Sequence, residues 1–164
     1  MLQIGENYDV LCVVYGMKPL AILNGSKLGR ENHAIYHDTV LTNEVIQLCY
    51  ENDIWCIHNR STRSPIYTKT VFFHKDNYND AVNLMAVIFY DRATVRNYDY
   101  IIGKSLGYSL ENIQAFYDHN NMGSLSKEEA VEFDKQIEEL DVTLEQLNVE
   151  FPGELVLIKE ISFI

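Results

Sequence analysis

The sequence lacks the residues that a covalent scaffold would require. It has only 3 cysteines among 164 residues, Cys12, Cys49 and Cys56. This odd number at irregular spacing provides neither a disulfide framework nor a Cys-x-x-Cys metal motif. Two of the three stand among apolar residues, so we expect buried, reduced thiols of the kind found inside the cell. No cofactor is therefore expected to be needed for folding.

Long hydrophobic runs are absent as well. No stretch approaches the roughly 20 apolar residues of a membrane span. The first ten residues, MLQIGENYDV, show no basic segment followed by an apolar core and a cleavage site. We therefore expect a cytoplasmic protein that does not associate with membranes.

Proline is scarce, with 3 residues, whereas hydrophobic residues make up 47% of the chain and aromatic residues 12%. This composition is typical of a globular protein, and the length matches one domain of ordinary size. No linker and no internal repeat divides the sequence, so we expect a single domain over 1–164. Few prolines with many Asn, Tyr, Asp and Ile residues suggest, on composition alone, a small AT-rich genome such as that of a virus.

Short runs rich in β-branched and aromatic residues predict strands. These runs are Tyr8–Gly16, Pro19–Leu23, Ile54–His58, Thr68–His74 and Glu154–Ile164. Four of them are early and one is C-terminal, with the predicted helices mostly between. This order favours an α+β fold, in which a small mixed or antiparallel sheet of the early strands and the C-terminal strand packs against a helical cluster.

Helices are predicted from apolar residues at helical spacing and from capping residues. Thr42 is a suitable N-cap for a helix ending near Glu51, and Ser126 with Glu129 forms a capping box. The segment 79–90 is apolar on nearly every side, which predicts a helix in the centre of the fold. The next segment, 95–106, either continues it as one bent helix or forms a second. After it, Gly107 and Ser109 predict a helix corner, with an apolar stripe of Leu110, Ile113, Phe116 and Tyr117.

Charge is distributed unevenly along the chain. Residues 1–107 contain 11 acidic and 10 basic residues, whereas residues 108–164 contain 13 acidic and 3 basic residues. Nearly all of the formal net charge of −11 therefore belongs to the last third. Such a field repels nucleic acid and anionic membranes and attracts basic proteins.

This acidic third leads to the first functional hypothesis, a non-enzymatic binding protein. Carboxylates at helical spacing could imitate the phosphates of a nucleic acid and occupy the basic groove of a nucleic-acid-handling protein, as an inhibitor would. Direct binding to nucleic acid is not expected. The predicted partner-binding residues are Glu128, Glu132, Asp134, Glu138, Glu139 and Glu145.

The alternative hypothesis is a binder, or a hydrolase, of a phosphorylated small molecule or nucleotide that uses the segment HNRSTRSP, His58–Pro65. Arginine offers a planar set of donors that matches phosphate oxygens, and hydroxyl groups add further donors. The predicted ligand-binding residues of this segment are Arg60, Ser61, Thr62, Arg63 and Ser64. Arg92 and Arg96, one helical turn apart, would join them if their helix packs beside the loop. The structural alternative is that Arg60 and Arg63 pair with the protein's own carboxylates, while the hydroxyl groups bond turn amides in a polar loop between strands.

No motif predicts catalysis. Ser61 or Ser64 could in principle act as a nucleophile with His58, His74 or His119 as base, but no Gly-x-Ser-x-Gly sequence supports this arrangement. We therefore favour binding over an enzymatic activity. His33 and His37, with Asp38 beside them, could share a face, but two such ligands without a further motif do not make a metal site.

Overall fold

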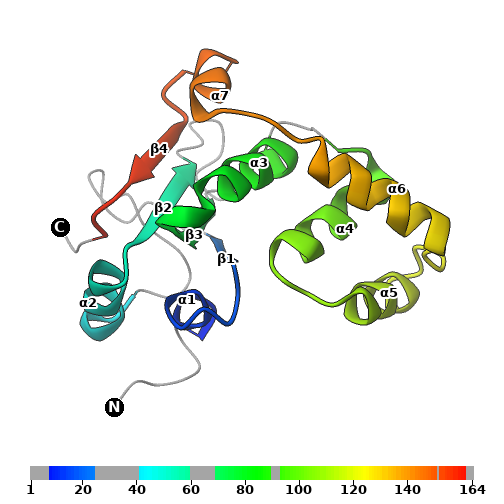
Figure 1. Ribbon diagram of the computed structural model, residues 1–164, viewed down its shortest axis with the longest axis horizontal. Helices are drawn as coiled ribbons and strands as arrows, with labels where there is room; N and C mark the ends of the chain where they lie inside the picture. The colour runs from blue at the N-terminus through cyan, green and yellow to red at the C-terminus, as the bar shows by residue number, and fades with distance from the viewer. Residues whose placement is uncertain (1–7, 25–40, 60–68, 90–92, 151, 162–164) are drawn as a thin grey trace.

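The structure is a computed structural model that describes residues 8–24, 41–59, 69–89, 93–150 and 152–161. The described residues form seven α-helices and one antiparallel sheet of four strands (Figure 1). This confirms the predicted α+β class. The elements are α1 (Tyr8–Val14), β1 (Leu20–Asn24), α2 (Asn43–Glu51), β2 (Ile54–Asn59), β3 (Lys69–His74), the 3-10 turn η2 (Lys75–Asn77), α3 (Tyr78–Phe89), α4 (Val95–Ser105), α5 (Leu110–His119), α6 (Lys127–Glu138), α7 (Leu144–Glu150) and β4 (Leu155–Ile158).

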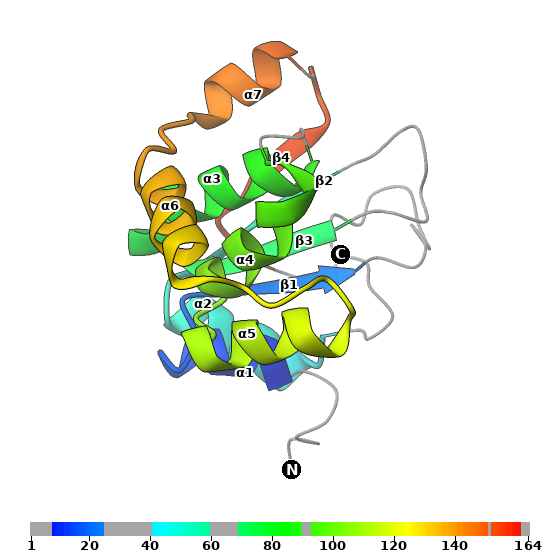
Figure 2. The same cartoon turned by 90° about the vertical axis from the view of Figure 1, so that its right-hand side faces the viewer.

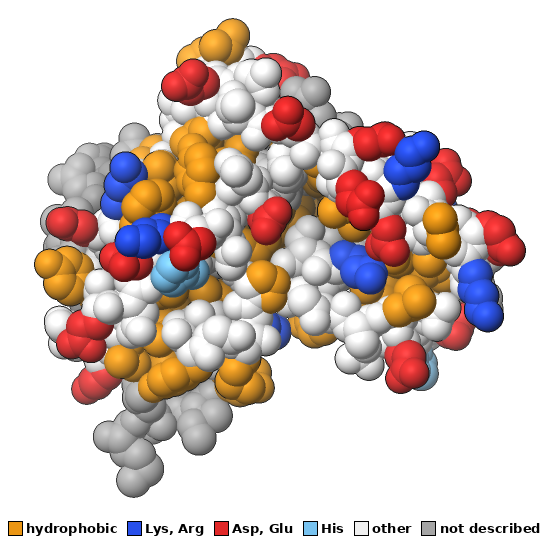
Figure 3. Space-filling view, viewed as in Figure 1, with side chains coloured by type: hydrophobic (Ala, Val, Ile, Leu, Met, Phe, Trp, Pro, Cys, Tyr) orange, Lys and Arg blue, Asp and Glu red, His pale blue; other side chains and the backbone are white. Residues whose placement is uncertain are grey.

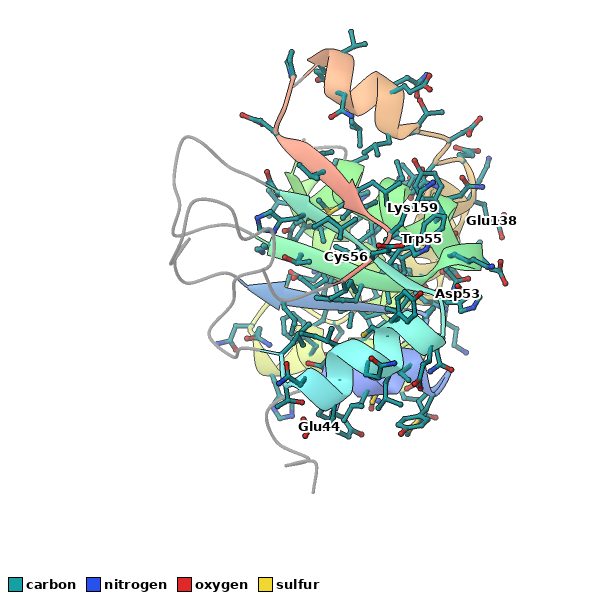
Figure 4. All side chains as sticks on the ribbon, turned by 90° about the vertical axis from the view of Figure 1, so that its left-hand side faces the viewer. Glu44, Asp53, Trp55, Cys56, Glu138 and Lys159 are labelled. Atoms are coloured by element: carbon teal, nitrogen blue, oxygen red, sulfur yellow. The ribbon has the colours of Figure 1, made fainter. Side chains whose placement is uncertain are left out.

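The sheet has the strand order β1-β3-β2-β4. The C-terminal strand β4 pairs with β2, so it completes the sheet as predicted. Side chains alternate between the two faces. On β2, Ile54 and Cys56 belong to one core cluster, whereas Trp55 and Ile57 belong to the other. Lys159, directly after β4, places its Nζ 4.8 Å from the centre of the Trp55 ring (Figure 4), a contact between a cation and an aromatic face that joins the end of β4 to β2.

Each face of the sheet is covered by helices. Helices α1 and α2 pack on one face, where Val10 and Val45 join Phe72 of the central strand β3. Helix α3 packs on the other face, together with Leu147 of α7. The prediction that the apolar segment 79–90 lies at the centre of the fold is confirmed, because α3 also contacts α4 on its far side.

The helices α4, α5 and α6 form a further layer beyond α3, called here the helical cluster (Figures 1 and 2). Helices α5 and α6 both contact α4. Their common core contains Tyr100 of α4, Ile113 and Tyr117 of α5, and Phe133 of α6. The sequence left open whether 79–106 forms one bent helix or two helices. The structure has two, α3 and α4, and α4 begins after its N-cap Thr94.

Two strand predictions need correction. The segment Tyr8–Gly16 was predicted as a strand and instead forms the helix α1. Its valines favour an extended backbone locally, but the helix buries Val10, Leu11 and Val13 against the sheet, and this tertiary packing outweighs β-propensity. The C-terminal strand is also shorter than predicted, since β4 ends at Ile158.

Local capping signals were more reliable. The Thr42 hydroxyl accepts the Val45 amide at 3.3 Å, and the Ser109 hydroxyl accepts the Asn112 amide at 3.2 Å. The capping box of Ser126 and Glu129 is formed in both directions. These contacts depend on residues within one helical turn, which is why the sequence pattern was sufficient. The three cysteines are free and buried, as predicted.

The turn between α4 and α5 depends on Gly107, whose φ is +87°. A Cβ at this position would lie 2.8 Å from Cδ of Pro19. Gly16 has a similar φ of +71° but no atom within 4 Å of a built Cβ.

We expect Gly16→Ala to cost about 1 kcal/mol of unfolding free energy through backbone strain alone. Gly107→Ala should cost about 2 kcal/mol or more, because overpacking adds to that strain. Urea denaturation measures both, and equal losses would contradict a clash with Pro19.

Candidate functional site

The orientation of α6 determines which of its carboxylates reach solvent. Ala130, Phe133 and Ile137 recur at helical spacing and pack into the core of the helical cluster. Glu128, Glu132 and Glu139 lie four and seven residues apart on the opposite side, and all three are exposed. Figure 3 shows Asp and Glu side chains gathered over α6, with a few basic side chains among them.

The exposed carboxylates of α6 and its C-cap are called here the α6 acidic face: Glu128, Glu132, Glu138 and Glu139. Within the described part of the chain, no hydrogen bond or ion pair ends on the first three. Glu139 lies 3.9 Å from Nζ of Lys135, and both side chains are exposed, so this pair contributes little. Lys127 and Lys135 partly offset the negative charge of this face.

Asp134 and Glu145, also predicted to bind a partner, are placed differently. Asp134 accepts a hydrogen bond of 2.6 Å from the Tyr100 hydroxyl and lies 3.7 Å from Nζ of Lys104, so it connects α6 to α4. Burial and this hydrogen bond raise the pKa of Tyr100. Glu145 is exposed, but it belongs to α7 rather than to the α6 acidic face. The sequence could not show that Asp134 has a structural role, because this depends on the side chains of α4 that face it, Tyr100 and Lys104.

Arg96, predicted to bind a ligand, donates to groups of the protein itself. Its Nε lies 2.9 Å from a carboxylate oxygen of Glu129, and a second nitrogen donates to the other oxygen at 3.2 Å. The guanidinium also donates to the backbone carbonyls of Met122 and Ser124. It therefore connects α4 to the loop between α5 and α6. The donors of the Arg96 guanidinium are therefore engaged within the fold.

The other predicted ligand-binding residues, Arg60, Ser61, Thr62, Arg63, Ser64 and Arg92, lie outside the described residues. The anion site in this segment stays a prediction. His33 and His37 also lie outside the described residues.

The three histidines considered as bases lie on separate elements. His58 is buried in β2, with Nδ1 2.8 Å from the Thr70 hydroxyl. His74 accepts the Asp76 amide at 3.2 Å, and His119 is exposed at the end of α5. Among the described residues there is no group of three His, Cys, Asp or Glu side chains that could hold a metal ion.

A pocket between α4 and α5 is a feature that the sequence did not reveal. The predicted apolar stripe of α5 is buried only at Ile113 and Tyr117, whereas Leu110 and Phe116 are 37% and 46% exposed. Phe116 lines the pocket together with Asp99 of α4. The apolar stripe of α5 is wider than the surface that its neighbouring helices cover, and this width was the sign in the sequence that some of it would stay exposed.

Comparison of the chain with protein-family models, with curated proteins and with solved structures found no match. None of the helices that the structure describes has the length and apolarity to cross a membrane.

The contact between Arg96 and Glu129 leads to a prediction about acid stability. The hydrogen bond from Arg96, and next the backbone amide of Ser126, lower the pKa of Glu129 from 4.5 to about 2. A lowered carboxyl pKa stabilises the folded state above the unfolded value, and this stabilisation is lost as the pH falls through the folded value. We expect Glu129→Gln to lower the thermal midpoint at pH 7, and the difference from wild type to shrink between pH 4.5 and about 2.

Circular dichroism melts across this pH range provide the measurement. Glu132→Gln is the matched control, because Glu132 is exposed on the same helix and has no partner among the described residues. Its midpoint should stay close to that of wild type at every pH. If both variants follow the same pH profile, the contact with Arg96 does not contribute to stability.

Proposed function

We propose that this protein acts by binding a basic protein through the α6 acidic face. The observation that carries the proposal is the arrangement of Glu128, Glu132 and Glu139, which are exposed on the side of α6 opposite its buried residues. Among the residues that the structure describes, these carboxylates make no ion pair apart from the long contact of Glu139 with Lys135, so they are available to a partner.

The spacing of these carboxylates supports a partner that normally handles nucleic acid. Residues four apart on a helix are separated by ~6 Å along its axis, and residues seven apart by ~10 Å. A nucleic acid strand carries one negative charge per ~3.4 Å. The carboxylates of the α6 acidic face carry the same sign of charge at a wider spacing. The proposed mode is occupation of a basic groove by α6, which would exclude nucleic acid from that groove.

The acidic excess of the last third would act over a longer range. Residues 108–164 contain 13 acidic and 3 basic residues, so their field attracts a basic surface before contact and repels phosphates. We therefore propose fast association that weakens as salt rises, without direct binding of nucleic acid to this chain. The proposal includes no chemical reaction. A cytoplasmic location suits it, because the three thiols are free and buried.

Charge reversal tests this proposal. The triple variant Glu128→Lys, Glu132→Lys, Glu139→Lys should weaken binding to a basic nucleic-acid-binding protein by about tenfold or more, because like charges then face each other. The panel consists of purified nucleic-acid-handling enzymes with basic grooves, with polylysine as a probe of charge alone. Surface plasmon resonance at low and at physiological salt measures the association rate and the affinity. Double-stranded DNA should compete with the protein for the groove.

The matched control changes the same amount of charge elsewhere: Glu44→Lys, Glu51→Lys, Glu160→Lys. All three residues are exposed, and none belongs to the helical cluster. This control should retain most of the affinity and show a slightly slower association. Equal losses in the two triple variants would indicate a non-specific effect of net charge, and the α6 acidic face would then not be the binding site.

A further inference from the structure

Helices α4 and α5 form an antiparallel pair that turns at Gly107. They approach closely at Gly103, where an added Cβ would lie 3.0 Å from the Ile113 side chain. Further along the pair, the Tyr117 hydroxyl donates to the Arg96 carbonyl at 2.6 Å. Beside this contact the two helices line a pocket of about 540 Å³ that is partly open to solvent; its volume lies within the ~300–1000 Å³ of typical ligand sites. Figure 1 shows the two helices that form it.

The pocket has mainly apolar walls. The residues that line it are Asp99, Ile102, Gly103, Tyr108, Asn112, Ile113, Ala115, Phe116 and His119. Two of its aromatic side chains are incompletely covered, since Tyr108 is 44% and Phe116 46% exposed. Gly103 provides room because a larger residue there would meet Ile113. The walls therefore offer an apolar contact surface that the fold leaves uncovered.

Asp99 is the one carboxylate in this lining. Burial raises the pKa of Asp99, because the partly desolvated surroundings disfavour the charged carboxylate. Within the described part of the chain, no hydrogen bond or ion pair ends on this carboxylate. A partly buried carboxylate without a partner lowers stability, and groups whose pKa is shifted by burial cluster at functional sites.

The nearby basic side chains are engaged with other groups. Lys18 lies over the Tyr108 ring, but its ammonium pairs with Asp9 at 3.0 Å. Lys104, adjacent to Gly103, lies 3.7 Å from the Asp134 carboxylate. Arg96, one turn before Asp99, donates to Glu129. The remaining titratable groups of the lining are Tyr108 and His119.

We infer that the pocket between α4 and α5 binds a cation, a primary ammonium or guanidinium group carried on an apolar or aromatic body. The cation would pair with Asp99, and the body would lie against Ile102, Ile113 and Phe116. Exposed aromatic rings at the same pocket add attraction for a cation over their faces. This site is separate from the proposed function, because no residue of the α6 acidic face lines it.

The first test compares three soluble probes at pH 7 and low salt by titration calorimetry. They are 2-phenylethylamine, the similarly shaped but uncharged 2-phenylethanol, and a capped Phe-Lys dipeptide. We expect at least one cationic probe to bind about tenfold more tightly than the alcohol, the difference typical of a hydrogen bond to a charged group. Binding of the amine would indicate a small-molecule ligand, and binding of the dipeptide alone a side chain of a protein. Equal binding of the alcohol, or binding of no probe, would overturn the inference.

Two variants with matched controls locate the site. Asp99→Asn should remove the preference for the cation, whereas Asp141→Asn, an exposed aspartate outside the pocket, should retain it. Ala115→Trp should weaken all probes by filling the pocket, whereas Val131→Trp, at an exposed position of α6, should not. Unchanged preference in Asp99→Asn would overturn the inference.

Thermal unfolding separates binding from folding. Because burial raises the pKa of Asp99, its charge opposes folding at neutral pH, and Asp99→Asn should melt at or above the wild-type midpoint. A clear fall in the midpoint would instead identify Asp99 as a residue that the fold requires, and would also overturn the inference.

Discussion

The arrangement of the helical cluster depends on the contact between Arg96 and Glu129. Glu129 accepts the Ser126 amide in the capping box and also two nitrogens of Arg96. One carboxylate therefore begins α6 and connects it to α4. A second polar contact, from the Tyr100 hydroxyl to Asp134, joins the same two helices further along. Together with the buried residues Ala130 and Phe133, these contacts orient α6 so that its remaining carboxylates reach solvent.

The sheet and the helical cluster have different roles. The sheet is covered on one face by α1 and α2 and on the other by α3 and α7, so its side chains are engaged in packing. The helical cluster has a smaller core and packs on the sheet through α3. It presents both the α6 acidic face and the pocket between α4 and α5. Both proposed sites therefore lie on the helical cluster, which packs on the sheet through α3.

The two proposed sites would act through forces of different range. The α6 acidic face is exposed, so its attraction acts over about 8 to 10 Å at ordinary salt and weakens as salt rises. The pocket would cover the apolar body of its proposed ligand, so contact area and one short ion pair would decide the affinity. Salt dependence should therefore distinguish the two in one set of measurements. An acidic patch gives speed of association more than strength, whereas a pocket gives selectivity.

The sequence by itself determined the local features: the α+β order of elements, the caps at Thr42, Ser109 and Ser126, and the acidic excess of the last third. These features depend on residues close together in the chain or on composition, and both can be read directly from the sequence. Only the tertiary structure decided the helical state of α1, where burial against the sheet outweighed the preference of its valines. It also decided which charged groups are engaged internally, as at Arg96, because that depends on partners more than 25 residues away. The pocket at Asp99 was hidden for the same reason, since it exists only where two helices meet.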